Sequence, residues 1–237
     1  MKKLFIVANW KSNKTTQEAV EWLKEILNLK SQISNLDQKE MIICPAFTSL
    51  AVMNWFIKEN NLPLKLGSQN ISNFEEGAYT GEVNAKQVSE YATHVIVGHS
   101  ERRRLLHETD EDILAKLKQV LAHNLTPVLC ISDMAQLDHY LAESSAVKDN
   151  ADNIIFVYEP PSAISGGGAY HPESPEDANT NAAEISKKVG KRVVTLYGGS
   201  VNPDNAKQLF EQEYIDGGLI GQAALDPNSF LHITNNS

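Results

Sequence analysis

The chain has 237 residues, of which 42% are hydrophobic, and this is enough apolar material for one large core. Its 30 acidic and 21 basic residues give a formal net charge of −9, which argues against nonspecific binding to nucleic acids or anionic membranes. Cys44 and Cys130 lack the spacing of metal ligands, so we expect two reduced, buried thiols. The apolar run at residues 4–8 is too short for a secretion signal, and no run reaches a transmembrane length, so we expect a cytoplasmic protein.

Short apolar runs rich in β-branched residues alternate with helix-patterned stretches along the chain. The runs predict eight strands, at residues 5–8, 41–44, 64–67, 94–97, 127–131, 154–157, 193–196 and 218–220. Residues 15–18 and 109–112 are typical of capping boxes and predict two helix starts, whereas the short interval 132–153 predicts a shortened helix. Eight strands alternating with helices indicate a parallel sheet buried on both faces. The pattern alone fits both a closed barrel and an open doubly wound sheet.

Polar side chains follow the first and fourth predicted strands. Asn9 and Lys11 are two residues apart, so in extended backbone they face the same side. His99 lies where a strand leads into a helix, and the positive end of that helix favours the neutral imidazole, which can donate a hydrogen bond to a reacting oxygen. The alternatives for these residues are a structural histidine and a solvated surface lysine.

Similar features follow the later strands. Glu159 ends the sixth strand at an apolar mouth, which raises the basicity of a carboxylate, although an ion-pairing glutamate is the alternative. Glycine-rich turns at 197–200 and 217–222 follow the last two strands, and their small residues let backbone N–H groups approach an anion such as phosphate. In parallel α/β proteins the chemistry lies at the carboxyl ends of the strands, so these residues predict one shared site.

Five segments in this order resemble the triosephosphate isomerase family over nearly the whole chain. They are Ala-Asn-Trp-Lys at 8–11, Gly-His-Ser-Glu-Arg-Arg at 98–103, Tyr-Glu-Pro at 158–160, Tyr-Gly-Gly-Ser-Val at 197–201 and Leu-Ile-Gly-Gln-Ala at 219–223. Gln69-Asn70 and the loop 77–82 are similar to the third-loop pattern of the family. The resemblance implies an α/β fold, a (β/α)8 TIM barrel forming a single domain over residues 1–237, in a short form of the family. It also implies an isomerase of D-glyceraldehyde 3-phosphate and dihydroxyacetone phosphate in glycolysis and gluconeogenesis, without metal or organic cofactor.

The roles of the site residues follow from the resemblance and are the established ones of the family. Glu159 would be the base that moves a carbon-bound proton, and His99 the neutral electrophile. Lys11 would be the cationic partner of the enediolate and phosphate, with Asn9 as a nearby donor. The phosphate of the substrate would lie against backbone N–H groups, those of Ser165, Ser200, Gly221 and Gln222. For Glu101 two interpretations stay open, a neighbour of the lysine or an acid that suits a helix start.

The chain departs from the family pattern in its lid segment, which begins at Glu159. Ser165 replaces a glycine, and the stretch 169–175 is longer than usual. Gln222 replaces a glycine of the phosphate loop and adds a side chain beside the anion. Since lid closure excludes water and protects the enediolate, these changes leave an alternative function, a catalytically weakened phosphate-binding or interaction protein on the same barrel.

The loop 77–82 also predicts assembly. In the family this loop enters the neighbouring subunit, where its threonine, here Thr80, supports the lysine of that subunit. We therefore expect a homodimer through this loop, with an ordinary turn-rich loop as the alternative.

Overall fold

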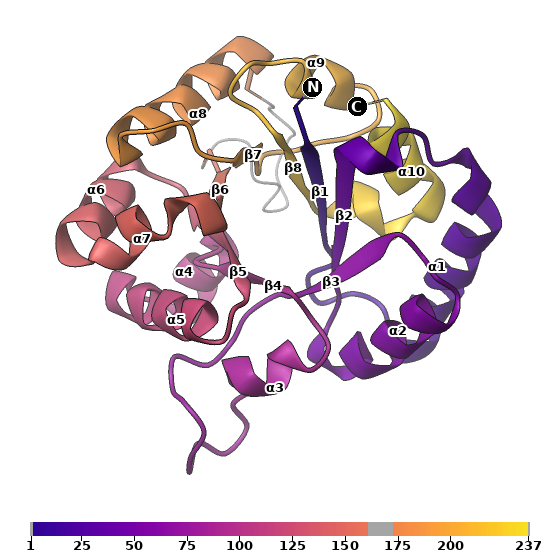
Figure 1. Cartoon of the computed structure of the whole chain (residues 1–237), viewed down its shortest axis with the longest axis horizontal. Coiled ribbons are helices and arrows are strands. Elements are labelled where there is room, and N and C mark those ends of the chain that lie inside the picture. The colour runs from indigo at the N-terminus through magenta and orange to yellow at the C-terminus, as the bar shows by residue number, and fades with distance from the viewer. Residues whose placement is uncertain (1, 161–172, 237) are drawn as a thin grey trace.

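The structure is a computed structural model, and it describes residues 2–160 and 173–236. Its strands pair in parallel in the order β1 to β8, and β8 pairs with β1 to close the barrel. Helices surround this ring on its outside (Figure 1). The closed (β/α)8 barrel confirms the fold implied by the family resemblance and settles the choice that periodicity left open.

All eight predicted strands are present, with ends that differ from the prediction by up to two residues. The strands are β1 (Leu4–Asn9), β2 (Lys39–Cys44), β3 (Leu64–Ser68), β4 (His94–Val97), β5 (Thr126–Ile131), β6 (Ile155–Tyr158), β7 (Thr195–Tyr197) and β8 (Gly217–Ile220). The described α-helices are α1 (Thr16–Leu29), α2 (Phe47–Glu59), α3 (Ala85–Ser89), α4 (Ser100–Leu106), α5 (Asp110–Ala122), α6 (Met134–Glu143), α7 (Ser145–Asp149), α8 (Pro175–Val189), α9 (Ala206–Phe210) and α10 (Pro227–Asn235).

Side-chain caps decide several of the helix ends. Thr15 and Thr109 each form the predicted capping box, with Glu18 and Asp112 respectively. Between β5 and β6 the prediction of one shortened helix is wrong, because two helices, α6 and α7, lie there. Ser144 has extended backbone that ends α6, and its hydroxyl accepts the N–H of Ala146 and so starts α7.

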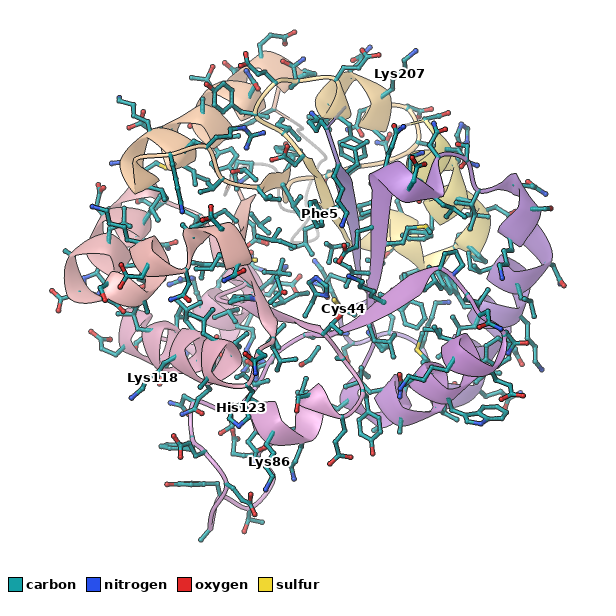
Figure 2. The ribbon with its side chains drawn as sticks, viewed as in Figure 1. Phe5, Cys44, Lys86, Lys118, His123 and Lys207 are labelled. Carbon is teal, nitrogen blue, oxygen red and sulfur yellow. The ribbon has the colours of Figure 1, made fainter. Side chains whose placement is uncertain are left out.

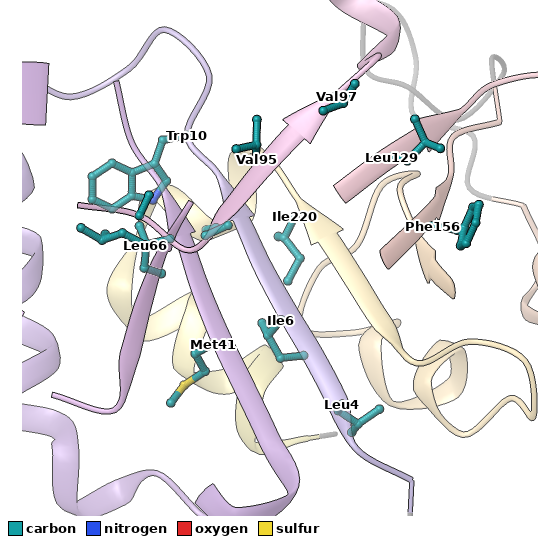
Figure 3. Packing of buried hydrophobic residues seen from close by; sticks show 14 of the residues in the cluster. Leu4, Ile6, Trp10, Met41, Leu66, Val95, Val97, Leu129, Phe156 and Ile220 are labelled. Carbon is teal, nitrogen blue, oxygen red and sulfur yellow. The ribbon is translucent and has the colours of Figure 1, made fainter. Parts of the chain in front are cut away.

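The apolar side chains of the strands form two layers, as the pleat of a strand requires. The interior of the barrel holds Val7, Ile42, Cys44, Ile96, Val128, Cys130, Ile155, Val157, Leu196 and Leu219. Their neighbours along the strands, such as Ile6, Met41 and Phe156, pack on the outside against the helices (Figure 3). Figure 2 places Cys44 near the centre of the ring and Lys118 and Lys207 at its periphery. Both cysteines are free and buried, as expected, and burial raises the pKa of each thiol.

No helix in the described part of the chain is long and apolar enough to cross a bilayer.

Candidate active site

A cavity of about 340 Å³ lies at the carboxyl ends of the strands. Its lining comes from residues at or just beyond the carboxyl ends of β1, β4, β6, β7 and β8: Asn9, Lys11, His99, Glu159, Gly198, Gly199, Ser200, Val201, Asn202, Leu219, Gly221, Gln222 and Ala223. The structure therefore brings together the predicted site residues Asn9, Lys11, His99, Glu159, Ser200, Gly221 and Gln222. Ser165 lies outside the described residues.

Glu159 is buried at the end of β6, where its own N–H donates to the carbonyl of Ile131 at 2.9 Å. Its Oε2 accepts the backbone N–H of Ser100 at 3.0 Å. Its Oε1 lies 3.1 Å from Nε2 of His99, a close approach without the alignment of a hydrogen bond. Burial raises the pKa of Glu159, and the nearby His99, the Ser100 amide and the Cys130 thiol oppose this only in part. The carboxylate is thus a stronger base than an exposed glutamate.

His99 caps helix α4 with its imidazole. Its Nδ1 accepts the backbone N–H of Glu101 at 3.2 Å. Because an amide N–H can only donate, this bond requires an unprotonated Nδ1, and the imidazole proton then resides on Nε2. The ring presents Nε2–H toward Glu159 and the cavity. In this tautomer the neutral imidazole can donate a hydrogen bond to a ligand in the cavity.

Lys11 is held in a left-handed backbone conformation, with φ of 53°, that non-glycine residues rarely adopt. Its N–H donates to Oδ1 of Asn9 at 3.1 Å, and its carbonyl accepts the side-chain amide of Gln69 at 2.9 Å. The same amide donates to the carbonyl of Cys44 at 2.9 Å. Gln69 therefore fixes the turn that carries Lys11, a role that the sequence motif alone did not assign to it.

The ammonium of Lys11 lies 2.6 Å from Oε1 of Glu101, so Glu101 is a neighbour of the lysine. Glu101 also lies in the first turn of α4, where an acidic side chain suits the helix start. Both interpretations of Glu101 from the sequence therefore apply. Gly221 is close to the same side chain, since a Cβ placed there would lie 3.4 Å from Cε of Lys11.

The turns after β7 and β8 supply the glycine-rich part of the cavity lining. In the described part of the chain, the backbone N–H groups of Gly221 and Gln222 donate to no carbonyl of another loop or turn, as a backbone site for an anion requires. On the neighbouring turn, a Cβ at Gly199 would overlap the phenol ring of Tyr197, so only glycine fits. The carbonyl of Ser200 accepts the side-chain amide of Asn205 at 2.9 Å, which orients the start of this turn.

Among residues 2–160 and 173–236, no group of three His, Cys, Asp or Glu side chains is placed to hold a metal ion.

Comparisons with known proteins show to which family the chain is similar. The family model described as triosephosphate isomerase matches residues 4–237. The triosephosphate isomerase of Dictyoglomus thermophilum is 36% identical over 254 residues, covering 98% of this chain and 99% of that protein. That of Polynucleobacter asymbioticus is 36% identical over 251 residues, with the same coverage. The crystal structure of triosephosphate isomerase from Bartonella henselae has a TM-score of 0.82, 29% identity, and coverage of 99% of this chain and 98% of that one. The chain belongs to the triosephosphate isomerase family.

Proposed function

We propose that this chain interconverts D-glyceraldehyde 3-phosphate and dihydroxyacetone phosphate, with Glu159 as the base. The observation that carries the proposal is the meeting of a buried carboxylate of raised pKa, a neutral imidazole and an ammonium in one cavity. Family membership supports the same reaction and its place in glycolysis and gluconeogenesis. It does not favour the alternative of a catalytically weakened binding protein.

The reaction moves a proton between adjacent carbons through an enediolate. Glu159 removes the proton from one carbon and returns it to the next, and its raised pKa brings it closer to the strength that a base needs near neutral pH. Gly198 allows the carboxylate to reach the cavity, because a Cβ there would lie 2.8 Å from Cγ of Glu159.

His99 and Lys11 stabilise the charge that develops on the substrate oxygens. Nε2–H of His99 donates a hydrogen bond to these oxygens, and the imidazole need not lose a proton first. The ammonium of Lys11 attracts the enediolate and the phosphate, and the side-chain amide of Asn9, whose Oδ1 accepts the backbone N–H of Lys11, lines the same cavity as a further donor.

The phosphate is proposed to bind the backbone N–H groups of Ser200, Gly221 and Gln222. Their wall of the cavity lies beside Lys11, so the anion would meet amide donors and one full positive charge. The predicted contribution of Ser165 stays a prediction.

The reaction is tested with purified protein and each three-carbon phosphate supplied separately. We expect both substrates to reach the same final ratio. Replacing Glu159 by Gln should lower kcat by about 10²- to 10⁴-fold, the usual contribution of a general base. Inorganic phosphate should inhibit the wild type and bind the variant with similar affinity. A variant with wild-type kcat would refute the assignment of the base.

We also propose that the chain forms a homodimer through the loop that contains Thr80. The segment between β3 and α3 projects beyond the ring of helices (Figure 1). Within this segment Phe74 and Tyr79 stack with ring centroids 4.2 Å apart, although both side chains are exposed.

A second hollow, of about 250 Å³, offers a place for this loop on a partner subunit. It opens beside Lys11 and His99 and is bordered by Leu105 and Leu106, which are 62% and 60% exposed. A two-fold arrangement would cover these leucines and bring Thr80 of each subunit toward Lys11 of the other.

The assembly is tested by light scattering at micromolar concentration, where we expect twice the chain mass. Leu106→Glu should produce monomers of low activity, whereas Leu36→Glu, at an exposed leucine that precedes β2, should leave the dimer intact. A fully active wild-type monomer would contradict the proposal. A cytoplasmic location is likewise proposed, from the two free, buried thiols.

A further inference from the structure

Glu173, outside the catalytic cavity, connects the ends of two neighbouring strands. The hydroxyl of Tyr158, the last residue of β6, donates to Oε1 of Glu173 at 3.1 Å. The backbone N–H of Glu173 donates to the hydroxyl of Tyr197, the last residue of β7, at 3.3 Å. Both phenols are buried, being 8% and 1% exposed, so the two hydrogen bonds form in an apolar setting.

The two tyrosines immediately precede the residues that form the active site. Tyr158 is followed by Glu159, and Tyr197 is followed by Gly198 and Gly199. The phenol ring of Tyr197 occupies the space where a side chain at residue 199 would be, so it packs against the turn that leads to the phosphate cradle. Gly198 in turn lies against Cγ of Glu159 and donates its N–H to the carbonyl of Tyr158 at 2.7 Å.

The carboxylate of Glu173 is held there at a cost to folding. Its Oε2 is buried and has no hydrogen-bond partner among the described residues. Burial raises the pKa of Glu173; the hydrogen bond from Tyr158 lowers it, and the charge of Asp177, in the first turn of α8, raises it. A carboxylate with a raised pKa beside the proposed base is a candidate for a functional role, and its hydrogen bonds to the strand ends say what that role would be.

We infer that Glu173 is a positioning residue for the isomerase reaction, because it links Tyr158 to Tyr197 and so fixes the Glu159 carboxylate relative to the phosphate cradle. This inference rests on the proposed function. Glu173 touches no substrate in this role; it acts through the strand ends. Its loss should therefore slow the proton transfer while leaving phosphate binding intact.

The test compares steady-state kinetics of Glu173→Ala, Glu173→Gln and Tyr158→Phe with the wild type. We expect Glu173→Ala to lower kcat about 10-fold, as a small displacement of a base does, with KM and the inhibition constant of inorganic phosphate within about 2-fold. Tyr158→Phe should show the same loss. The double variant should be no slower than either single variant, since both remove one interaction. Glu173→Gln keeps an acceptor for the Tyr158 hydroxyl and should recover most of kcat.

Two controls separate positioning from general effects. Glu176→Ala removes another carboxylate, from the first turn of α8, and it should keep wild-type kcat. Thermal unfolding of each variant reports whether it folds, and the near-isosteric Glu173→Gln remains informative if the alanine variant is unstable. In Glu173→Gln the fall of kcat on acidification should become smaller, because residue 173 no longer titrates. The groups that face this residue are Tyr158 from β6, Tyr197 from β7 and Asp177 from α8.

The inference is overturned if folded Glu173→Ala keeps kcat within about 2-fold of the wild type, a change worth less than about 0.5 kcal/mol. Additive losses in the double variant, or an equal loss in Glu176→Ala, would overturn it as well. A wild-type protein without isomerase activity would instead refute the proposed function, so the two failures are distinguishable.

Discussion

Gly198 offers a sharp test of how closely the base is packed. A Cβ at this position would lie 2.6 Å from Cγ1 of Val157, 2.8 Å from Cγ of Glu159 and 3.1 Å from the carbonyl oxygen of Tyr158. The backbone cannot retreat easily, because the N–H of Gly198 already donates to that carbonyl at 2.7 Å. Val157 is enclosed in the barrel interior, so in Gly198→Ala the side chain of Glu159 has to move.

Two effects set the size of the change. Overpacking of an interior site costs about 1–3 kcal/mol of folding free energy. A displacement of a catalytic group by about 1 Å costs about 10²-fold in rate. We therefore expect Gly198→Ala to lower kcat about 100-fold with KM within about 3-fold, since the amides of Ser200, Gly221 and Gln222 remain in place.

The assay is the steady-state isomerase reaction, accompanied by urea unfolding. Gly67→Ala is a matched control, because its Cβ would lie 2.6 Å from Sγ of Cys44 on β2, across the barrel from β7. It should lose a similar unfolding free energy but keep kcat within about 3-fold. If Gly198→Ala is destabilised like the control and still has wild-type kcat, the carboxylate does not depend on this contact and the reasoning is refuted.

Three further predictions follow from the charges and hydrogen bonds around the barrel. Because burial raises the pKa of Glu159, kcat at saturating substrate should fall on acidification well above the pH at which an exposed glutamate titrates, near about 4.3; a flat profile down to that pH would contradict this. Glu40, at the opposite end of the barrel, has a lowered pKa because of its hydrogen bond with His94 and those from Lys3 and Lys65, so its stabilisation is present above its unfolded-state pKa and is lost as pH falls toward the lowered one. Glu40→Gln should cost about 1–2 kcal/mol at neutral pH in urea unfolding and flatten the decline of stability between about pH 5 and 2, and an unchanged decline would exclude this source. Gln69→Ala removes both hydrogen bonds that hold the turn of Lys11 and should lower kcat/KM roughly 10-fold in steady-state assays; no loss would mean that the left-handed lysine is held by Asn9 alone.

The strands could be predicted because most of their residues are buried, so each strand contains a short and largely apolar run. The errors lie at the strand ends, because hydrogen-bonded pairing with the neighbouring strand, rather than the composition of the segment, decides where a strand begins and ends. Val193 and Val194 are apolar and were expected in the seventh strand, but β7 begins at Thr195, which is in register with Phe156 of β6. Closure of the barrel depends on pairing of β8 with β1, and no local pattern encodes a contact between the two ends of the chain. The family resemblance supplied that part of the prediction.

The helices between β5 and β6 show a second limit. Both α6 and α7 have helix-forming sequences, and periodicity treats the interval as one short helix. A single serine divides them, because Ser144 combines extended backbone with a hydroxyl that caps the next helix. Whether a serine caps a helix or lies within one depends on the packing of its neighbours, here the buried Tyr140 and Val147.

The candidate site likewise contains residues that a local sequence pattern reveals and residues whose role depends on tertiary contacts. Asn9, His99 and Glu159 were predictable because each lies at the carboxyl end of a strand or within two residues of it, and the parallel strands of a barrel bring such residues to one rim. Gln69 and Glu173 act on other residues rather than on a ligand. Gln69 finds its partner only when the turn after β3 packs against the turn after β1, and Glu173 finds its partners only when β6 pairs with β7. Such supporting contacts leave no fixed spacing in the sequence. Their variation can therefore change the rate of a barrel enzyme while every residue of its recognisable motifs stays the same.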